Sequence, residues 1–205
     1  RFLKSLEDLK SRTRASRPFQ NSLATSEIVI NFSSNFDNNL EARNAFRFAA
    51  DMWEMEIISS VPIIIDADFR DLGSNVIAQN GSNVVSNVPN APDPTLVYVS
   101  SLGNSIAGED LLPGQPDLIQ TYNSSFNFYY GLDANPPPNQ TDFVTIAFHE
   151  IGHGIGITGS SNGGEGVGRS SGAFPNAWDT FVELADGTPI LDLPFGSAPQ
   201  TEALI

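Results

Sequence analysis

The stretch from Asp142 to Gly156 constrains this chain more than any other. It reads D-F-V-T-I-A-F-H-E-I-G-H-G-I-G and contains the pattern H-E-x-x-H at His149, Glu150 and His153. Residues four apart lie on one face of an α-helix, so the two imidazoles can both reach one Zn²⁺ ion. Glu150 lies about 100° round such a helix from His149, where it can take a proton from a metal-activated water. The stretch therefore predicts a metal-binding helix.

The other residues of this stretch predict how the helix is held. Apolar residues fall on the side opposite the two histidines, at Val144, Ala147, Phe148, Ile151 and Ile155. Such a stripe would bury the helix against a sheet and aim the histidines into a cleft. Thr141 or Asp142 can cap the start, and glycines crowd the end. The chain has no other histidine, which favours a shared role for this pair.

Composition narrows the class of protein. The 205 residues are 40% hydrophobic, enough for a globular chain with a sizeable core. The chain has no cysteine, which excludes disulfides, thiolate zinc sites and a cysteine-based latency switch. No apolar run approaches the length of a membrane span.

Charge is spread unevenly along the chain. Residues 1–20 carry six Lys/Arg and two Asp/Glu, a balance of +4, and are predicted to form a basic tail or linker. The other 185 residues carry four Lys/Arg and 22 Asp/Glu, a balance of −18. An acidic body argues against nucleic acid or an anionic membrane as partner. It leaves Ca²⁺ as a second candidate ion, although no D-x-D-x-D-G loop is present.

Periodicity and turn residues predict an alternation of strands and helices. Strands are expected at residues 27–32, 62–69, 95–100 and 117–122, with the second in a central position. Helices are expected at residues 40–58, over the metal-binding stretch, and as a short segment at 177–184. Residues 72–94, 106–116 and 158–172 are rich in Gly, Asn, Ser or Pro and are expected to be mostly loop.

This order of elements resembles the upper half of a zincin metallopeptidase domain. The segment R-N-A-F-R-F-A-A-D-M-W followed by V-P-I-I-I is similar to the backing helix and next strand of metzincins. H-E-I-G-H-G-I-G matches their H-E-x-x-H-x-x-G, with Gly156 at the glycine. Further segments resemble secreted bacterial zinc-peptidase-like proteins that often carry a protease-associated domain. These segments include I-A-G-E-D-L, P-D-L-I-Q-T-Y-N-S-S-F-N-F-Y-Y-G-L-D and F-P-N-A-W-D-T-F-V, and together they span most of residues 27–183.

The resemblance implies an α+β, zincin-like fold: a twisted mixed sheet with a backing helix, an active-site helix and a small irregular C-terminal subdomain. The expected boundaries are a tail at 1–20 and a metallopeptidase-like domain at 21–205, divided into an upper part at 21–156 and a lower part at 157–205. The native chain is expected to continue further. The chain is expected to be a monomer. The sequence shows no signal peptide, so the chain is either cytosolic or has lost a leader, and the resemblance implies a protein that is secreted or held at the cell surface after leader removal.

The chain departs from the metzincin pattern at the third metal ligand. Their third histidine would fall at Gly159, and the only methionines, Met52 and Met55, lie upstream of the metal helix rather than in a Met-turn after it. A catalytic zinc usually has three protein ligands, so the third should be a carboxylate. The candidates after the helix are Glu165, Asp179, Glu183, Asp186, Asp192 and Glu202. Asp179 is the first choice and Glu183 the second; Asp179 could instead orient a ligand histidine or serve as a helix-start charge.

The sequence thus favours a zinc-dependent endopeptidase with His149, His153 and Asp179 on the metal and Glu150 as general base. Glu150 would also pass the proton to the leaving amine. An extended protein or peptide substrate could pair with the strand at 95–100 or at 117–122. A tyrosine could assist the oxyanion, with Tyr98, Tyr122, Tyr129 and Tyr130 available. The alternatives are a catalytically idle, zinc-holding surface or adhesion module and a metal-free binding domain.

Overall fold

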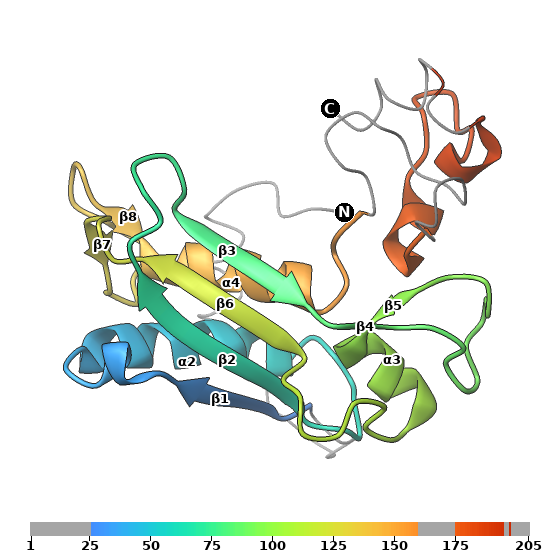
Figure 1. Ribbon diagram of the computed structural model, residues 1–205. Helices are drawn as coiled ribbons and strands as arrows, with labels where there is room; N and C mark the ends of the chain where they lie inside the picture. Colours follow the sequence, from blue (N-terminus) through green and yellow to red (C-terminus); the bar gives the residue numbers. More distant parts are fainter. Residues whose placement is uncertain (1–25, 160–174, 195–196, 198–205) are drawn as a thin grey trace, which may run out of the picture.

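A four-stranded mixed sheet lies at the centre of the fold, within residues 26–159, 175–194 and 197, which the computed structural model describes (Figure 1). The strand order is β1-β2-β6-β3. β1, β2 and β6 are parallel, and β3 is antiparallel to β6. The strands are β1 (Ile28–Phe32), β2 (Ile63–Arg70), β3 (Ala78–Ser82) and β6 (Leu118–Asn123). This mixed α+β architecture agrees with the coarse fold class expected from the sequence.

Two helices, α2 (Leu40–Glu54) and α4 (Phe143–Gly154), cover one face of the sheet (Figure 1). The Asn39 side chain caps α2 by accepting a hydrogen bond from the Ala42 amide at 3.0 Å. The buried face of α2 is rich in alanine, which lets the helix approach the sheet closely: Ala42, Ala45, Phe46, Ala49, Ala50 and Met52. The predicted helix at 40–58 is confirmed, but it ends at Glu54.

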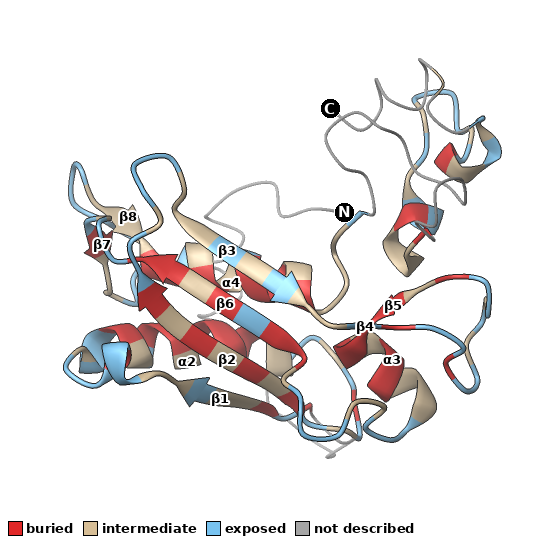
Figure 2. Ribbon diagram, viewed as in Figure 1, coloured by how far each residue is buried: buried red, intermediate tan, exposed pale blue. Residues whose placement is uncertain are grey.

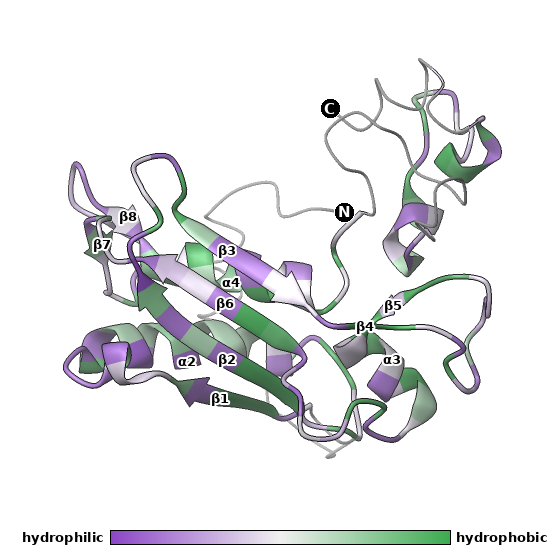
Figure 3. Ribbon diagram, viewed as in Figure 1, coloured by the Kyte–Doolittle hydropathy of each residue, from purple (hydrophilic) through white to green (hydrophobic). Residues whose placement is uncertain are grey.

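The alternation of β2 explains why only one face is covered. Its residues are buried and half-buried by turns until the exposed Arg70, as a strand with one packed and one open face requires (Figure 2). The apolar ends of β1, β2 and β6 lie together in the sheet (Figure 3). Under the helices, Phe143 packs against Tyr122 and Phe128 with ring centroids 4.9 and 5.1 Å away. The predicted central position of the second strand is confirmed.

One prediction about local structure was wrong, and another missed two strands. The expected strand at 95–100 shrinks to β5 (Tyr98–Val99), because helix α3 (Ser100–Ala107) begins directly after it. Residues 72–94 are mostly loop, as expected, but they also contain β3 and β4 (Val84–Val85). Helix α3 and strand β3 are rich in Gly, Asn and Ser, residues of low helix or strand propensity. Contacts distant in sequence stabilise them, such as the buried Ser100 hydroxyl that donates to Asp117 at 2.6 Å.

The remaining elements are short. They are β7 (Phe128–Tyr129), β8 (Thr141–Asp142) and the 3₁₀ turns η1 (Ser34–Phe36), η3 (Ala177–Phe181) and η4 (Ile190–Asp192). The predicted short helix at 177–184 is therefore a 3₁₀ turn. The predicted basic tail at 1–20 and most of the loop at 158–172 lie outside the described residues. No helix in the described part of the chain is long and apolar enough to cross a membrane.

Candidate metal centre

Helix α4 starts and packs as its sequence predicts. Asp142 is its N-cap and accepts a hydrogen bond from the Thr145 amide at 3.1 Å. Val144, Ala147 and Ile151 of the apolar stripe are buried against the rest of the core. The histidines therefore emerge from the opposite side of a helix whose rotation about its axis is determined by burial.

Trp53 of α2 ties the middle of α4 to its neighbour. The Trp53 ring stacks on Phe148, with centroids 4.4 Å apart and an interplanar angle of 10°. Its Nε1–H donates to the Phe148 carbonyl at 2.9 Å. Phe148 directly precedes His149, so this contact holds the turn of α4 from which the first histidine projects.

The two histidine side chains converge on one point. His149 Nε2 and His153 Nε2 are 2.9 Å apart, and the rings meet edge to face at 84°. His153 Nδ1 lies 2.8 Å from the Ile157 carbonyl oxygen. A carbonyl can only accept, so Nδ1 carries a proton, and in the neutral ring His153 Nε2 then keeps its lone pair. The proton between the two Nε2 atoms therefore belongs to His149.

The turn after α4 supplies that carbonyl. The Gly156 amide donates to the His153 carbonyl at 3.2 Å, and the Ile157 amide donates to the Gly152 carbonyl at 3.0 Å. These two bonds form a Schellman motif, with Gly156 at φ +116°, a conformation that L-residues rarely adopt. The sequence predicted that glycines end the helix, but it did not indicate that the turn would orient His153.

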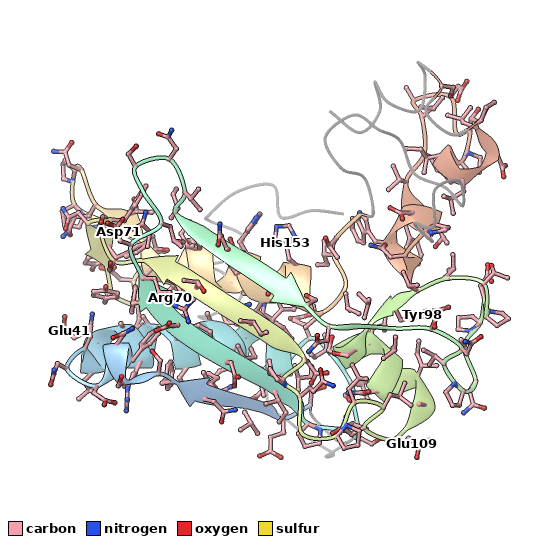
Figure 4. The ribbon with its side chains drawn as sticks, in the orientation of Figure 1. Glu41, Arg70, Asp71, Tyr98, Glu109 and His153 are labelled. Atoms are coloured by element: carbon pink, nitrogen blue, oxygen red, sulfur yellow. The ribbon has the colours of Figure 1, made fainter. Side chains whose placement is uncertain are left out.

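Glu150 lies beside the histidine pair in a partly enclosed site. Its exposed fraction is 9%, and burial raises the pKa of its carboxyl group, although His153 and His149 oppose the shift. Glu150 and His153 line a cavity of about 660 Å³ whose other wall is β3 together with Ile119 and Thr121 of β6. Figure 4 shows His153 projecting beside that strand. A carboxylate held near two imidazoles in this way is suited to accepting a proton.

Strand β3 presents a free edge along the cavity. The Asn123 amide donates to the Ile77 carbonyl, and the Asn83 amide donates to the Asp117 carbonyl. In an antiparallel ladder every second residue faces the partner strand, so the backbone groups of Ala78, Asn80 and Ser82 point away from β6. No described strand pairs with that side.

The strands predicted to pair with substrate are not available for it. The one at 117–122 corresponds to β6, which lies between β2 and β3, so the prediction for it was wrong. In the segment at 95–100, β5 pairs with β4, and Val97 forms a bridge to Asn176. The edge strand nearest the histidines is β3, which the sequence had indicated as part of a loop.

The third ligand does not join the histidines in this arrangement. Among the described residues, no group of three or more His, Asp or Glu side chains is placed to hold one metal ion. Asp179 is 1% exposed in η3, where its carboxylate accepts from the Asn176 amide at 2.9 Å and completes a capping box. The Asn176 side chain also donates to the Thr158 carbonyl at 2.5 Å, which connects this segment to the residues just after α4.

The other sequence candidates are placed less favourably. Glu183 and Asp186 are exposed, and Asp192 lies in η4. Glu165 and Glu202 lie outside the described residues. No tyrosine of the described chain lines the cavity beside His153. Tyr98 and Tyr122 are buried, and Tyr129 and Tyr130 line a separate cavity with Glu41.

The histidine pair fits a zinc ion. A tetrahedral ion with Zn–N bonds of about 2.0–2.1 Å separates two ligand nitrogens by roughly 3.3 Å. Small ring rotations from the observed 2.9 Å would reach that spacing once the proton on His149 Nε2 is lost.

Comparisons with protein-family models, curated proteins and solved structures found no match to this chain.

Proposed function

We propose that the chain is a zinc-dependent endopeptidase with a zincin-like organisation of its sheet and helices. The observation that carries the proposal is the pairing of His149 Nε2 with His153 Nε2 at 2.9 Å while the Ile157 carbonyl holds the proton on His153 Nδ1. Metal-binding histidines commonly donate their second ring nitrogen to a carbonyl or carboxylate in this way. With Glu150 between them in sequence, the arrangement favours hydrolysis over simple metal storage.

His149 and His153 would hold the ion through Nε2. When bound, zinc would lower the pKa of a water molecule and polarise the substrate carbonyl. Glu150 takes the proton from the attacking water and passes it to the leaving amine. Burial raises the pKa of Glu150, which makes its carboxylate a stronger base toward that water.

The free edge of β3 supports a peptide as substrate. Ala78, Asn80 and Ser82 offer backbone N–H and C=O groups to an extended chain, which would add as a further strand beside the histidines. Small molecules would make no use of such a row of alternating donors and acceptors. The resemblance to secreted bacterial peptidase-like proteins is the reason to propose an extracellular location.

Asp179 remains the proposed third ligand. The hydrogen bond from Asn176 to the Thr158 carbonyl supports the proposal, because it holds the segment that carries Asp179 near the end of α4. Ligation would require Asp179 to exchange its capping bond for the metal. The alternative is that Asp179 only stabilises η3.

The experiment compares wild type, Glu150→Gln and Asp179→Ala for zinc content by elemental analysis and for cleavage of a mixed peptide library. We expect one zinc per chain in wild type. In Glu150→Gln, zinc should be kept while hydrolysis falls by about 10²–10⁴-fold, the usual contribution of a general base. Zinc binding should be sharply weakened in Asp179→Ala. Full zinc retention there would refute Asp179 as ligand, and equal hydrolysis by wild type and Glu150→Gln would refute the mechanism.

One observation favours a second candidate, the catalytically idle zinc-holding module. Only two metal-binding side chains converge within the described residues, and a catalytic zinc normally has three. That candidate predicts zinc in both wild type and Glu150→Gln with no peptide cleaved by either. The absence of zinc from wild type, even after its addition, would favour a metal-free binding domain.

A further inference from the structure

A fully buried glutamine lies under the candidate active site. Gln120 is 0% exposed and occupies the core-facing side of β6, between Leu118 and Tyr122. An amide in such a position costs free energy unless its polar atoms are hydrogen-bonded. An aliphatic residue would pack equally well there, so the glutamine amide is expected to have a role that packing alone does not require.

Gln120 is the centre of a chain of side-chain hydrogen bonds. The Tyr122 hydroxyl donates to Gln120 Oε1 at 2.7 Å, and Gln120 Nε2 donates to Asn80 Oδ1 at 3.3 Å. Asn80 Nδ2 then donates to the Ser82 hydroxyl at 2.9 Å. We call these four residues the polar chain. It runs from the core to the edge strand, and the amide orientations of Gln120 and Asn80 follow from it.

The polar chain ends on the residues that would contact a substrate. Asn80 and Ser82 are paired in register with Gln120 and Leu118, so their side chains lie on the face of the sheet that α4 covers. Their backbone groups point to the free edge. Asn80 lines the same cavity as Glu150 and His153. Burial raises the pKa of the Tyr122 hydroxyl, and the charge of Glu150 adds to that rise.

Apolar side chains contribute little to holding strand β3, which relies on hydrogen bonds. Its sequence A-Q-N-G-S contains no β-branched or aromatic residue, and none of its five residues is buried. Apolar burial therefore contributes little to its position, and an edge strand has a partner on one side only. The backbone ladder to β6 and the contacts with α4 hold the strand, and the side-chain hydrogen bonds from the core add to them.

We propose that Gln120 and Asn80 are positioning residues that hold the edge of β3 in place for peptide binding. This inference rests on the proposed peptidase function. Loss of the polar chain loosens the strand that binds the peptide, while His149, His153 and Glu150 keep their positions on α4. We therefore expect KM to rise, with zinc content and kcat unchanged.

The test compares Asn80→Ala and Gln120→Met with wild type and with Asn31→Ala as a matched control. Asn31 also donates a side-chain hydrogen bond between strands, to Asp66 at 2.9 Å, but on β1 and away from the cavity. We expect KM for a cleaved peptide to rise about tenfold in the two polar-chain variants, with kcat within about twofold. The control should keep both values.

A second measurement is independent of catalysis. Backbone hydrogen exchange at Gly81, which faces β6 in the ladder, should become about tenfold faster in Asn80→Ala and Gln120→Met and stay unchanged in Asn31→Ala. Asn80 is half-buried, so Asn80→Ala decides the matter if Gln120→Met does not fold.

The outcomes separate the two proposals. Unchanged KM together with unchanged exchange at Gly81 overturns the positioning role, and so does a fall in kcat with KM constant. If wild type cleaves no peptide, the proposed function fails, and the exchange measurement alone then decides whether the polar chain holds β3.

Discussion

The turn after α4 allows the coupling between backbone strain and metal affinity to be measured. Gly156 has φ +116°, and a Cβ added there would lie 3.4 Å from Leu102 Cδ2. That contact is tolerable, so the effect of Gly156→Ala comes mainly from the backbone. Forcing an L-residue into such a conformation costs about 1–3 kcal/mol. The chain can avoid that cost only by opening the Schellman turn.

Opening the turn removes the Ile157 carbonyl from His153. The hydrogen bond of 2.8 Å that holds the proton on Nδ1 is then lost, and His153 can rotate or adopt the other tautomer. Loss of such a partner typically weakens metal binding about 10–100-fold. We therefore expect Gly156→Ala to lose about 1–3 kcal/mol of unfolding free energy and to bind zinc about 10–100-fold more weakly.

Gly73 provides the matched control. It also has a positive φ, +77°, and a Cβ there would meet nothing within 4 Å. Gly73→Ala should therefore lose about 1–2 kcal/mol of stability without any loss of zinc affinity. Unfolding by urea measures the first quantity, and competition with a chromophoric chelator measures the second. Equal zinc affinity in wild type and Gly156→Ala, with stability lowered as in Gly73→Ala, would refute the proposed link.

Two further predictions concern stability. Trp53→Phe keeps an aromatic ring on Phe148 but loses the Nε1–H hydrogen bond of 2.9 Å to the Phe148 carbonyl. The unfolding free energy, measured in urea, should therefore fall by about 1 kcal/mol. An unchanged unfolding free energy would contradict the role given to that hydrogen bond. For Asp68, burial raises the pKa, but hydrogen bonds led by those from Ser33 and Arg70 outweigh it, and the pKa lies below its ordinary 3.8. The carboxylate therefore stabilises the fold above that value and loses its contribution as the pH falls through the lowered folded-state pKa. The difference in unfolding free energy between wild type and Asp68→Asn should therefore shrink as the pH falls. A difference that grows on acidification would contradict a lowered pKa of Asp68 in the folded state.

Much of the metal helix could be predicted because its determinants are local. The histidines are four residues apart, the apolar residues repeat at helical spacing, and Asp142 precedes the first turn. Spacing and capping act within one or two turns, so they can be deduced from neighbouring residues alone. The same holds for α2 and for the apolar run that became β2.

The wall of the cleft could not be predicted for the opposite reason. β3 has the composition of a loop, and it becomes a strand because β6 offers a ladder and Gln120 offers a hydrogen bond from 40 residues away. The third metal ligand has the same difficulty. Whether Asp179 can reach the metal depends on where the segment after the glycine-rich stretch lies relative to α4. No local sequence pattern predicts that position.

The sequence by itself determined that one helix carries two imidazoles and a carboxylate on the side away from its apolar stripe, because helical geometry converts residue spacing directly into direction. Only the tertiary structure decided which nitrogen of His153 is free, since that depends on a carbonyl presented by the turn at Gly156. Only the tertiary structure placed a free strand edge beside the site. The tautomer of His153 and the position of the β3 edge both depend on tertiary contacts, which local sequence patterns do not predict.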